Sequence, residues 1–310
     1  MAANRLIIGT RGSKLALWQT NHIKEKLERY HRELSVEIKI IRTKGDKIQD
    51  VALAKIGGKG LFTKEIEEAM LAGVVHLAVH SLKDLPTDLP AGLVADIIPK
   101  RTRGADVLVS RNGSKFMDLP PGARVGTGSL RRKAQLGALR PELEYLDLRG
   151  NVDTRLAKLD RGDYEAIILS EAGLVRLGLT ERIIGVFSPE VLTPAAGQGA
   201  LAIEYRQDDS TAKELLSFLA DRKTTTEVEA ERAFLHTLGG GCQVPVGARA
   251  EFRKNGKLSV IGMISDLSGG RLLRDQIEDY PETGPGRELA EKMLAAGGRR
   301  ILEEIYGSSS

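Results

Sequence analysis

Arginine residues follow short apolar segments at several places along the chain, usually beside a glycine or a hydroxyl residue. They are Arg11, Arg131, Arg132, Arg149, Arg155 and Arg176. Backbone N–H groups at the start of a helix attract anions, and a guanidinium adds a forked donor that fits a carboxylate or a phosphate. Such places converge at one edge of an open α/β sheet. The pattern predicts an anion-binding site, with a solvated basic face as the alternative.

The segment His80-Ser81-Leu82-Lys83-Asp84-Leu85-Pro86 is a second candidate for chemistry. It places the Asp84 carboxylate beside Lys83 at the expected end of a strand, and Pro86 stiffens the turn. A carboxylate in such a position stabilises a cationic intermediate or acts as a general acid or base. The alternative is a surface turn with a local ion pair.

The single cysteine of the chain, Cys242, follows Gly239-Gly240-Gly241 and precedes Pro245 by three residues. Glycines let another group approach the backbone closely. A lone cysteine of this kind is an inert buried thiol, a point of covalent attachment or a nucleophile. His236 lies six residues earlier on an expected helix, which is a poor geometry for a Cys–His pair. These residues alone leave all three interpretations open.

Three further signals carry little weight. The Lys55–Gly60 stretch lacks the Ser or Thr that must follow the lysine of a phosphate loop, so we read it as a loop without that function. The segment Gly197–Ala202 imitates a dinucleotide fingerprint but follows a Pro-Ala-Ala turn, which favours a glycine hinge. His76 and His80 share one face of a strand but have no third ligand nearby, so we expect no metal site.

Composition excludes several classes of protein. Of 310 residues, 46 are basic and 42 acidic, and aromatic residues make up 4%, which disfavours a nucleic-acid binder. The longest apolar runs fall short of the roughly 18 residues of a membrane span, so we expect no membrane partner. The N-terminus shows no signal-peptide core, and a single cysteine excludes an internal disulfide framework. We therefore expect a cytoplasmic protein.

Apolar periodicity predicts an α/β architecture over about 190 residues, in which strands and helices alternate. The expected strands cover residues 5–9, 36–40, 77–80, 106–110, 124–126, 143–148 and 166–169, and the expected helices include 14–30 and 63–72. The last ninety residues instead predict a helix over 227–238, a hairpin with its turn at Asn255-Gly256, a turn at 268–270, and a helix from residue 287. This part reads as a smaller α+β domain.

Taken together and in order, these motifs resemble those of porphobilinogen deaminases, also called hydroxymethylbilane synthases. The matching segments are Gly9-Thr10-Arg11 with Ser13, Thr43-Lys44-Gly45-Asp46, Lys59-Gly60-Leu61-Phe62, 80–86, Leu130-Arg131-Arg132, Arg149-Gly150-Asn151-Val152 with Arg155, Gly197-Gln198-Gly199, and Gly240-Gly241-Cys242. The resemblance spans the whole chain. Gly12, Gly128, Gly239 and Ser170-Glu171 depart from the residues usual in the family.

The resemblance implies a fold with two domains of the periplasmic-binding-protein type that form a cleft, and a smaller α+β C-terminal domain. Domain 1 would comprise residues 1–99 and 200–220, domain 2 residues 105–194, and domain 3 residues 222–310. The third domain would carry Cys242 on a loop. A monomer is expected on the same ground.

The resemblance also implies an activity. Family members condense four molecules of porphobilinogen head to tail, release four ammonia molecules, and hydrolyse the product as linear hydroxymethylbilane, a step of heme and tetrapyrrole biosynthesis. They carry a dipyrromethane cofactor in thioether linkage to the cysteine matched by Cys242. Asp84 matches the catalytic aspartate of the family, and it would stabilise the cationic azafulvene that porphobilinogen becomes when it loses ammonia.

Two groups of residues would bind the carboxylates of the pyrroles. The cofactor would contact Asp46, Ser81, Lys83, Thr127, Gly128, Ser129, Arg131, Arg132, Arg149 and Gly150. The substrate would contact Arg11, Ser13, Lys55, Lys59, Phe62, Arg149, Arg155, Arg176 and Gln198. Two alternatives remain: an anion-binding cleft protein without catalysis, which explains neither Cys242 nor the third domain, and a cysteine hydrolase that uses Cys242 as its nucleophile.

Overall fold

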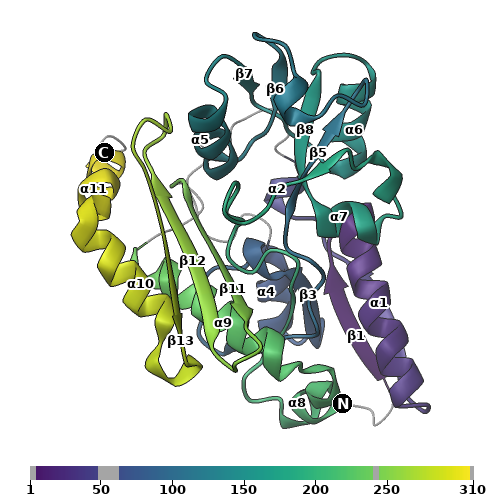
Figure 1. Cartoon of the computed structure of the whole chain (residues 1–310). Helices are drawn as coiled ribbons and strands as arrows, with labels where there is room; N and C mark the ends of the chain where they lie inside the picture. The colour runs from purple at the N-terminus through teal and green to yellow at the C-terminus, as the bar shows by residue number, and fades with distance from the viewer. Residues whose placement is uncertain (1–4, 48–62, 240–243, 308–310) are drawn as a thin grey trace.

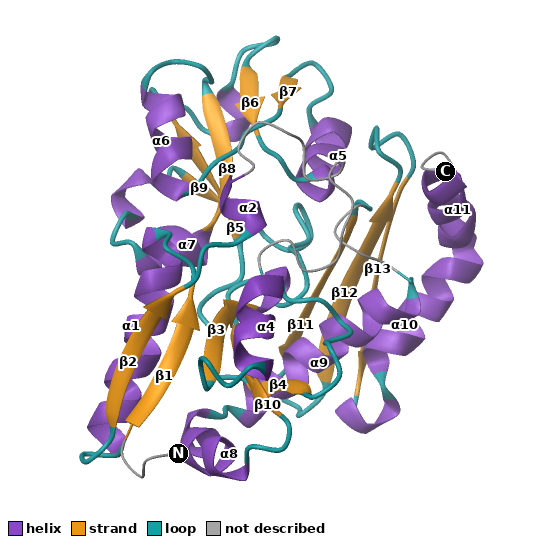
Figure 2. Ribbon diagram, turned by 180° about the vertical axis from the view of Figure 1, so that it is seen from behind, coloured by secondary structure: helices purple, strands orange, loops and turns teal. Residues whose placement is uncertain are grey.

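The computed structural model describes residues 5–47, 63–239 and 244–307, and its strands form three separate sheets (Figures 1 and 2). The first sheet has the strand order β2-β1-β3-β10-β4. Its strands are β1 (Arg5–Thr10), β2 (Ser35–Ile40), β3 (Leu77–Ser81), β4 (Leu93–Ile97) and β10 (Leu201–Arg206). Strands β1, β2 and β3 are parallel, whereas β10 runs antiparallel to both of its neighbours.

The helices of this first unit are α1 (Lys14–Tyr30), α2 (Lys44–Lys47), α4 (Lys64–Leu71) and α8 (Ser210–Leu216). Helix α1 begins at the hydroxyl cap of Ser13, whose side chain accepts a hydrogen bond from the Ala16 amide. Its buried residues, among them Ile23 and Leu27, pack against Leu6 and Ile8 of β1 in one apolar cluster. The amphipathic pattern of 14–30 is therefore satisfied by burial on the sheet.

The second sheet has the strand order β7-β6-β8-β5-β9. Its strands are β5 (Asp106–Ser110), β6 (Arg124–Gly126), β7 (Glu144–Leu146), β8 (Ala166–Ser170) and β9 (Gly185–Val186), and its helices are α5 (Leu130–Leu139), α6 (Val152–Asp160) and α7 (Glu171–Arg176). Strands β6, β7 and β8 are parallel, and β5 is antiparallel to β8. Separate apolar clusters cover its two faces.

The third sheet is an antiparallel meander of β11 (Val246–Phe252), β12 (Leu258–Ser265) and β13 (Leu272–Asp279). Helices α9 (Arg222–Thr237), α10 (Pro285–Met293) and α11 (Arg299–Gly307) pack against it, and Figure 1 shows this unit beside the other two. The predicted hairpin turn at Asn255-Gly256 is present, with Gly256 at a φ of 81°. Helix α9 begins earlier than predicted, because the Asp221 carboxylate caps the Thr224 amide.

The expected fold class is confirmed: two α/β units are joined to a smaller α+β unit. The sheets differ from a doubly wound pattern in one respect, because each α/β sheet contains an antiparallel strand, β10 in the first and β5 in the second. The proposed division into domains stays a prediction, although the return of β10 to the first sheet supports it. Within the described part of the chain, no helix is long and apolar enough to span a bilayer.

Candidate active site

The first sheet brings the turn that carries Asp84 beside the Gly197–Gly199 segment. Leu201, the first residue of β10, pairs with Ser81, the last residue of β3, because the two strands are antiparallel. A single 3₁₀ turn, Leu82–Asp84, follows β3, and the segment before β10 lies against it. The Lys83 ammonium consequently donates a hydrogen bond of 3.3 Å to the side-chain oxygen of Gln198.

The second sheet places a buried carboxylate at its corresponding edge. Asp106 is the first residue of antiparallel β5 and pairs with Ser170, the last residue of β8. Its two oxygens lie 2.8 Å from an Arg131 nitrogen and 2.7 Å from an Arg132 nitrogen. The Gln198 amide donates to the same carboxylate at 2.9 Å. Gln198 therefore connects Lys83 of the first sheet to Asp106 of the second.

This network is almost completely buried. Asp106 is 0% exposed, and Arg131 and Arg132 are each 5% exposed. Burial alone would raise the pKa of the Asp106 carboxyl, but the charges of the two arginines outweigh burial and hold the pKa well below its usual range. The carboxylate is thus ionised at every physiological pH, and it fixes both guanidinium groups in place.

The Asp84 carboxylate interacts electrostatically with Lys83 of its own turn and with Arg155 of the second α/β unit. Burial and the charges of Arg132 and Arg149 lower the pKa of Arg155 to about 10, and the Asp84 carboxylate opposes this shift. Burial likewise lowers the pKa of Lys83 to about 8, again opposed by Asp84. Asp84 itself is exposed to solvent. An accessible carboxylate is thus within electrostatic range of two cations, which is an arrangement suited to a ligand that is anionic at its edges and cationic at its reacting centre.

We call Lys83, Arg131, Arg132, Arg149 and Arg155 the cationic cluster. Its members outnumber the neighbouring carboxylates, Asp84 and Asp106. The Nε atom of Arg149 is buried and has no hydrogen-bond partner among the described residues. A buried donor without a partner, within an excess of positive charge, is costly unless an anion supplies the missing acceptor. The cluster is therefore chemically suited to bind carboxylates.

The predicted hydroxyl residues lie at the starts of helices and at strand ends, and each accepts a hydrogen bond within the protein. Ser81 Oγ accepts from the Gln19 amide at 2.8 Å, Ser129 Oγ accepts from the Arg132 backbone at 3.4 Å, and Thr127 Oγ1 accepts from the Ser129 backbone at 3.2 Å. Ser13 caps α1 in the same way at 3.2 Å. Each hydroxyl keeps its own proton to donate to a ligand oxygen.

Two glycines shape the loops after β6 and β7, and Gly128 lets the two loops approach each other. A Cβ atom on Gly128 would lie 2.8 Å from the Leu148 carbonyl oxygen, so this position favours glycine in this chain. Gly150 has a φ of 109°, and a Cβ atom there would meet Thr154 at 2.7 Å. The close approach at Gly128 brings the Thr127–Ser129 loop next to Arg149.

Other predicted residues occupy different positions. Arg176 is buried at the crossover between the sheets, where it donates to the Gly199 carbonyl at 2.7 Å and its guanidinium carbon lies 6.0 Å from the Trp18 ring. Arg11 follows β1 and is half-buried. The polar atoms of Gln198 are engaged by Lys83, Gly104 and Asp106, so its predicted contact with substrate stays untested.

Part of the predicted site lies outside the described residues. These residues are Lys55, Lys59, Phe62 and Cys242, and the side chain of Asp46 in α2 is likewise not described. The placement of the two histidines agrees with a structural role: His76 accepts from the Ile7 amide at 2.8 Å, and His80 lies 2.9 Å from Glu204. Among the described residues, no cluster of metal-ligating side chains is present.

The sequence reasoning missed Asp106. Ligand-binding residues are expected at the carboxyl ends of parallel strands, whereas Asp106 begins an antiparallel strand and reaches the same edge from the opposite direction. A signal was available in the sequence, because an acidic residue directly before an apolar strand, Val107-Leu108-Val109, is expensive to bury without a cation.

Comparison with known proteins connects this site to one family. The family model described as "Porphobilinogen deaminase, dipyromethane cofactor binding domain" matches residues 6–214, and the one described as "Porphobilinogen deaminase, C-terminal domain" matches residues 225–295. The chain is 50% identical over 308 residues to the porphobilinogen deaminase of Nitratidesulfovibrio vulgaris (strain DP4), which covers 98% of each chain.

The chain belongs to the porphobilinogen deaminase family. It is also 50% identical over 301 residues to the porphobilinogen deaminase of Syntrophobacter fumaroxidans, covering 96% of this chain and 97% of the relative. The chain is accordingly an enzyme, a transferase of tetrapyrrole biosynthesis with a dipyrromethane cofactor. Family membership decides against a cysteine hydrolase and against a binding module without catalysis.

Likeness to solved structures of other families is distant. The periplasmic aliphatic sulphonate binding protein SsuA of Escherichia coli aligns with a TM-score of 0.41 at 17% identity, over 76% of this chain and 71% of that chain. An ancestral arginine-binding protein bound to arginine aligns with a TM-score of 0.38 at 12% identity, over 71% and 92%. At these values the likeness does not bear on the ligand of this chain. The fold is described from the sheet topology of the chain itself.

The lowered pKa of Lys83 makes stability depend on pH. Below about pH 8 the folded and unfolded states both carry the proton, so the cost of burying the charge is present in full. Between about 8 and 10.4 only the unfolded state keeps it. For protein produced without porphobilinogen, we therefore expect the free energy of unfolding to rise over this interval.

The measurement is urea unfolding at pH 7.5, 9 and 10. Lys83→Met should remove the rise, and Lys133→Met, which changes an exposed lysine of α5, should retain it. An equal rise in all three proteins would show that Lys83 is not its source.

Proposed function

We propose that the enzyme condenses four porphobilinogen molecules head to tail into hydroxymethylbilane and releases four ammonia molecules. The observation that carries the proposal is the position of Asp84, an exposed carboxylate that follows the first sheet, next to Lys83 in the chain and within electrostatic range of Arg155. The site thus combines one free carboxylate with an excess of cations, which matches a substrate with two carboxylates and a reaction centre that becomes positive.

In this proposal the dipyrromethane is attached to Cys242, and when bound it supplies the pyrrole to which the first substrate is joined. The fit of this group is supported by the cationic cluster and by the unpaired Nε of Arg149. Arg131, Arg132 and Lys83 would hold carboxylates of the cofactor, and Ser129 and Thr127 would donate their hydroxyl protons. Asp106 keeps Arg131 and Arg132 in place for this task.

Asp84 acts on the substrate. Loss of ammonia from the aminomethyl group of porphobilinogen leaves a cationic azafulvene, and the Asp84 carboxylate stabilises that charge. A carbon–carbon bond then forms between this cation and the free α-carbon of the preceding pyrrole, and the carbon that was attacked loses its proton. Asp84 would accept that proton as a general base. After four such steps, water would cleave the bond that holds the first added pyrrole: its methylene carbon takes the hydroxyl group, a proton returns to the carbon left behind, and the linear product is released.

Arg149 and Arg155 would neutralise the acetate and propionate groups of the incoming ring. Arg11, Arg176, Ser13, Gln198, Lys55, Lys59 and Phe62 are proposed as further substrate contacts on the basis of the family motifs. A cytoplasmic location and a monomeric state belong to the same proposal, and so does the division into domains 1–99 with 200–220, 105–194, and 222–310.

The test is the stoichiometry of the reaction. Purified enzyme is supplied with porphobilinogen, ammonia is quantified, and the chain length of the product is determined by mass spectrometry under conditions that prevent cyclisation. We expect one ammonia for each porphobilinogen consumed and a linear product of four pyrroles. Ammonia release without a tetrapyrrole, or a product of two or three pyrroles as the end point, would contradict the proposal. Heat-unfolded enzyme is the control for spontaneous condensation.

A further inference from the structure

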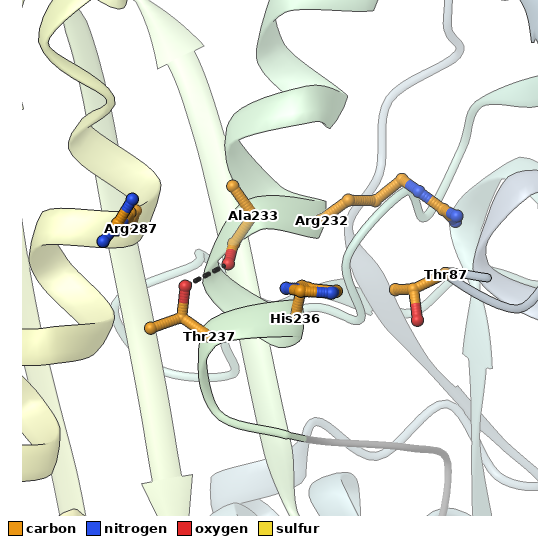
Figure 3. Close-up of a pocket in the computed structure, with 6 residues that line it drawn as sticks. All are labelled: Thr87, Arg232, Ala233, His236, Thr237 and Arg287. Carbon is orange, nitrogen blue, oxygen red and sulfur yellow. Dashed lines mark hydrogen bonds between the residues drawn. The ribbon is translucent and has the colours of Figure 1, made fainter.

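Arg232 of α9 reaches out of the C-terminal unit and contacts the turn that carries Asp84. Its guanidinium donates hydrogen bonds to the carbonyl oxygen of Leu85 at 3.2 Å and to that of Pro86 at 2.7 Å. These are the two residues that directly follow Asp84 in the chain. Figure 3 shows Arg232 extending from α9 toward the segment of Thr87, away from Arg287 of α10.

The turn needs support of this kind. Leu82–Asp84 is a single 3₁₀ turn, closed by the hydrogen bond of 3.1 Å from the Leu85 amide to the Leu82 carbonyl. Such short turns have poor hydrogen-bond geometry, and Pro86 has no N–H to contribute. The two carbonyl groups that follow are satisfied by Arg232, which thereby fixes the direction in which the chain leaves Asp84.

Helix α9 also packs against the Asp84 turn through an apolar side chain. Val228, one helical turn before Arg232, packs with Leu82 and Leu85 in one buried cluster. The helix itself is anchored by Glu231, which accepts from the Gly197 amide at 2.6 Å and pairs with Arg101 at 2.8 Å. Helix α9 therefore has little freedom to move relative to the Asp84 turn.

Helix α9 ends at Thr237, five residues before Cys242. We propose that Arg232 is a positioning residue, which holds the Asp84 turn in a fixed position relative to helix α9. This inference rests on the proposed role of Asp84. It assigns to the C-terminal unit a task in the reaction, namely to keep the Asp84 carboxylate in its working position.

The first test replaces Arg232 by methionine, which keeps an unbranched apolar stem and removes the guanidinium donors. A small displacement of a catalytic group lowers the rate without weakening substrate binding, so kcat should fall by about tenfold to a hundredfold while KM stays within about twofold. Arg232→Lys keeps a donor and should restore most of kcat. Each protein is first shown by intact mass to carry its cofactor.

Arg287→Met is the matched control. Arg287 lines the same cavity of about 290 Å³ as Arg232, but it donates to Glu291 of its own helix and not to the Asp84 turn. Its replacement should leave kcat and KM unchanged. If Arg232→Met lowers only the melting temperature and keeps the kcat of the cofactor-loaded enzyme, Arg232 is merely structural and the inference is wrong.

A double variant separates this inference from the proposed function. In an Asp84→Glu background the carboxylate is already displaced, so Arg232→Met should cost much less than it does in the wild type. If the effects of the two substitutions on kcat were fully additive, Arg232 would not act through Asp84.

Two single variants distinguish failure of the inference from failure of the proposed function. Loss of turnover in Asp84→Asn together with normal kcat in Arg232→Met would overturn the inference alone. Normal turnover in Asp84→Asn would remove the role of Asp84 itself. Should Arg232→Met fail to fold, Arg232→Gln takes its place, with an intermediate fall in kcat expected and an unchanged kcat contradicting the inference.

Discussion

Asp84→Asn should fold, acquire its cofactor more slowly, and turn over porphobilinogen about 10³- to 10⁴-fold more slowly than the wild type. Asparagine has the shape of aspartate but carries no charge and accepts no proton. Asp84 is exposed at the end of a 3₁₀ turn, so the fold does not depend on it. The Asp84 charge partly offsets the lowering of the Lys83 and Arg155 pKa values by burial. The same charge is proposed to stabilise the azafulvene.

The chain offers a closely matched control. Asp118 is also an exposed aspartate at the last position of a 3₁₀ turn, Phe116–Asp118, and it lies outside the cationic cluster. Asp118→Asn should retain wild-type kcat and KM. Steady-state kinetics on cofactor-loaded protein provides the measurement, and near-normal turnover by Asp84→Asn would remove Asp84 from the reaction.

Cys242→Ser has the second largest expected effect: the protein should fold but contain no covalent dipyrromethane and form no detectable tetrapyrrole. A thioether requires a thiol, and Cys242 is the only cysteine in the chain, so no other residue can take its place. The residues of the cationic cluster belong to the two α/β units, so we expect their positions not to depend on the Cys242 side chain. Circular dichroism and thermal melting should therefore resemble those of wild-type protein that lacks the cofactor.

Thiol chemistry distinguishes attachment from nucleophilic catalysis. If Cys242 holds the cofactor, the loaded enzyme has no titratable thiol and an alkylating reagent does not reduce its activity. If Cys242 were a nucleophile in each turnover, the thiol would be free and alkylation would stop the reaction. A free, alkylation-sensitive thiol in active enzyme would contradict the attachment.

The sequence predicted much of this site because strand ends are marked by local residue types. Arg131 and Arg132 follow the cap residue Ser129, and the structure confirms that a helix begins there. Lys83 and Asp84 follow an apolar strand, and the turn forms where Pro86 stiffens it. These features are local, since caps and turns depend on a few neighbouring residues.

What the sequence could not show are the contacts between distant segments. The antiparallel direction of β5 and β10 brings Asp106 and Gln198 into the network, and strand direction depends on connections rather than on local propensity. In the same way, the hydrogen bonds from Arg232 to Leu85 and Pro86 join segments almost 150 residues apart. Such contacts form only when the three units pack together.

The central claim is that this chain holds a dipyrromethane on Cys242 and extends it. Its most direct test is the intact mass of the purified wild type beside Cys242→Ser, each measured after incubation with porphobilinogen and under denaturing conditions. We expect the wild type to be heavier than its sequence by two condensed porphobilinogen units, or by more when chain growth is incomplete, and the serine variant to have the mass of its sequence. A wild-type mass equal to that of the sequence, or the same added mass on both proteins, would contradict the account.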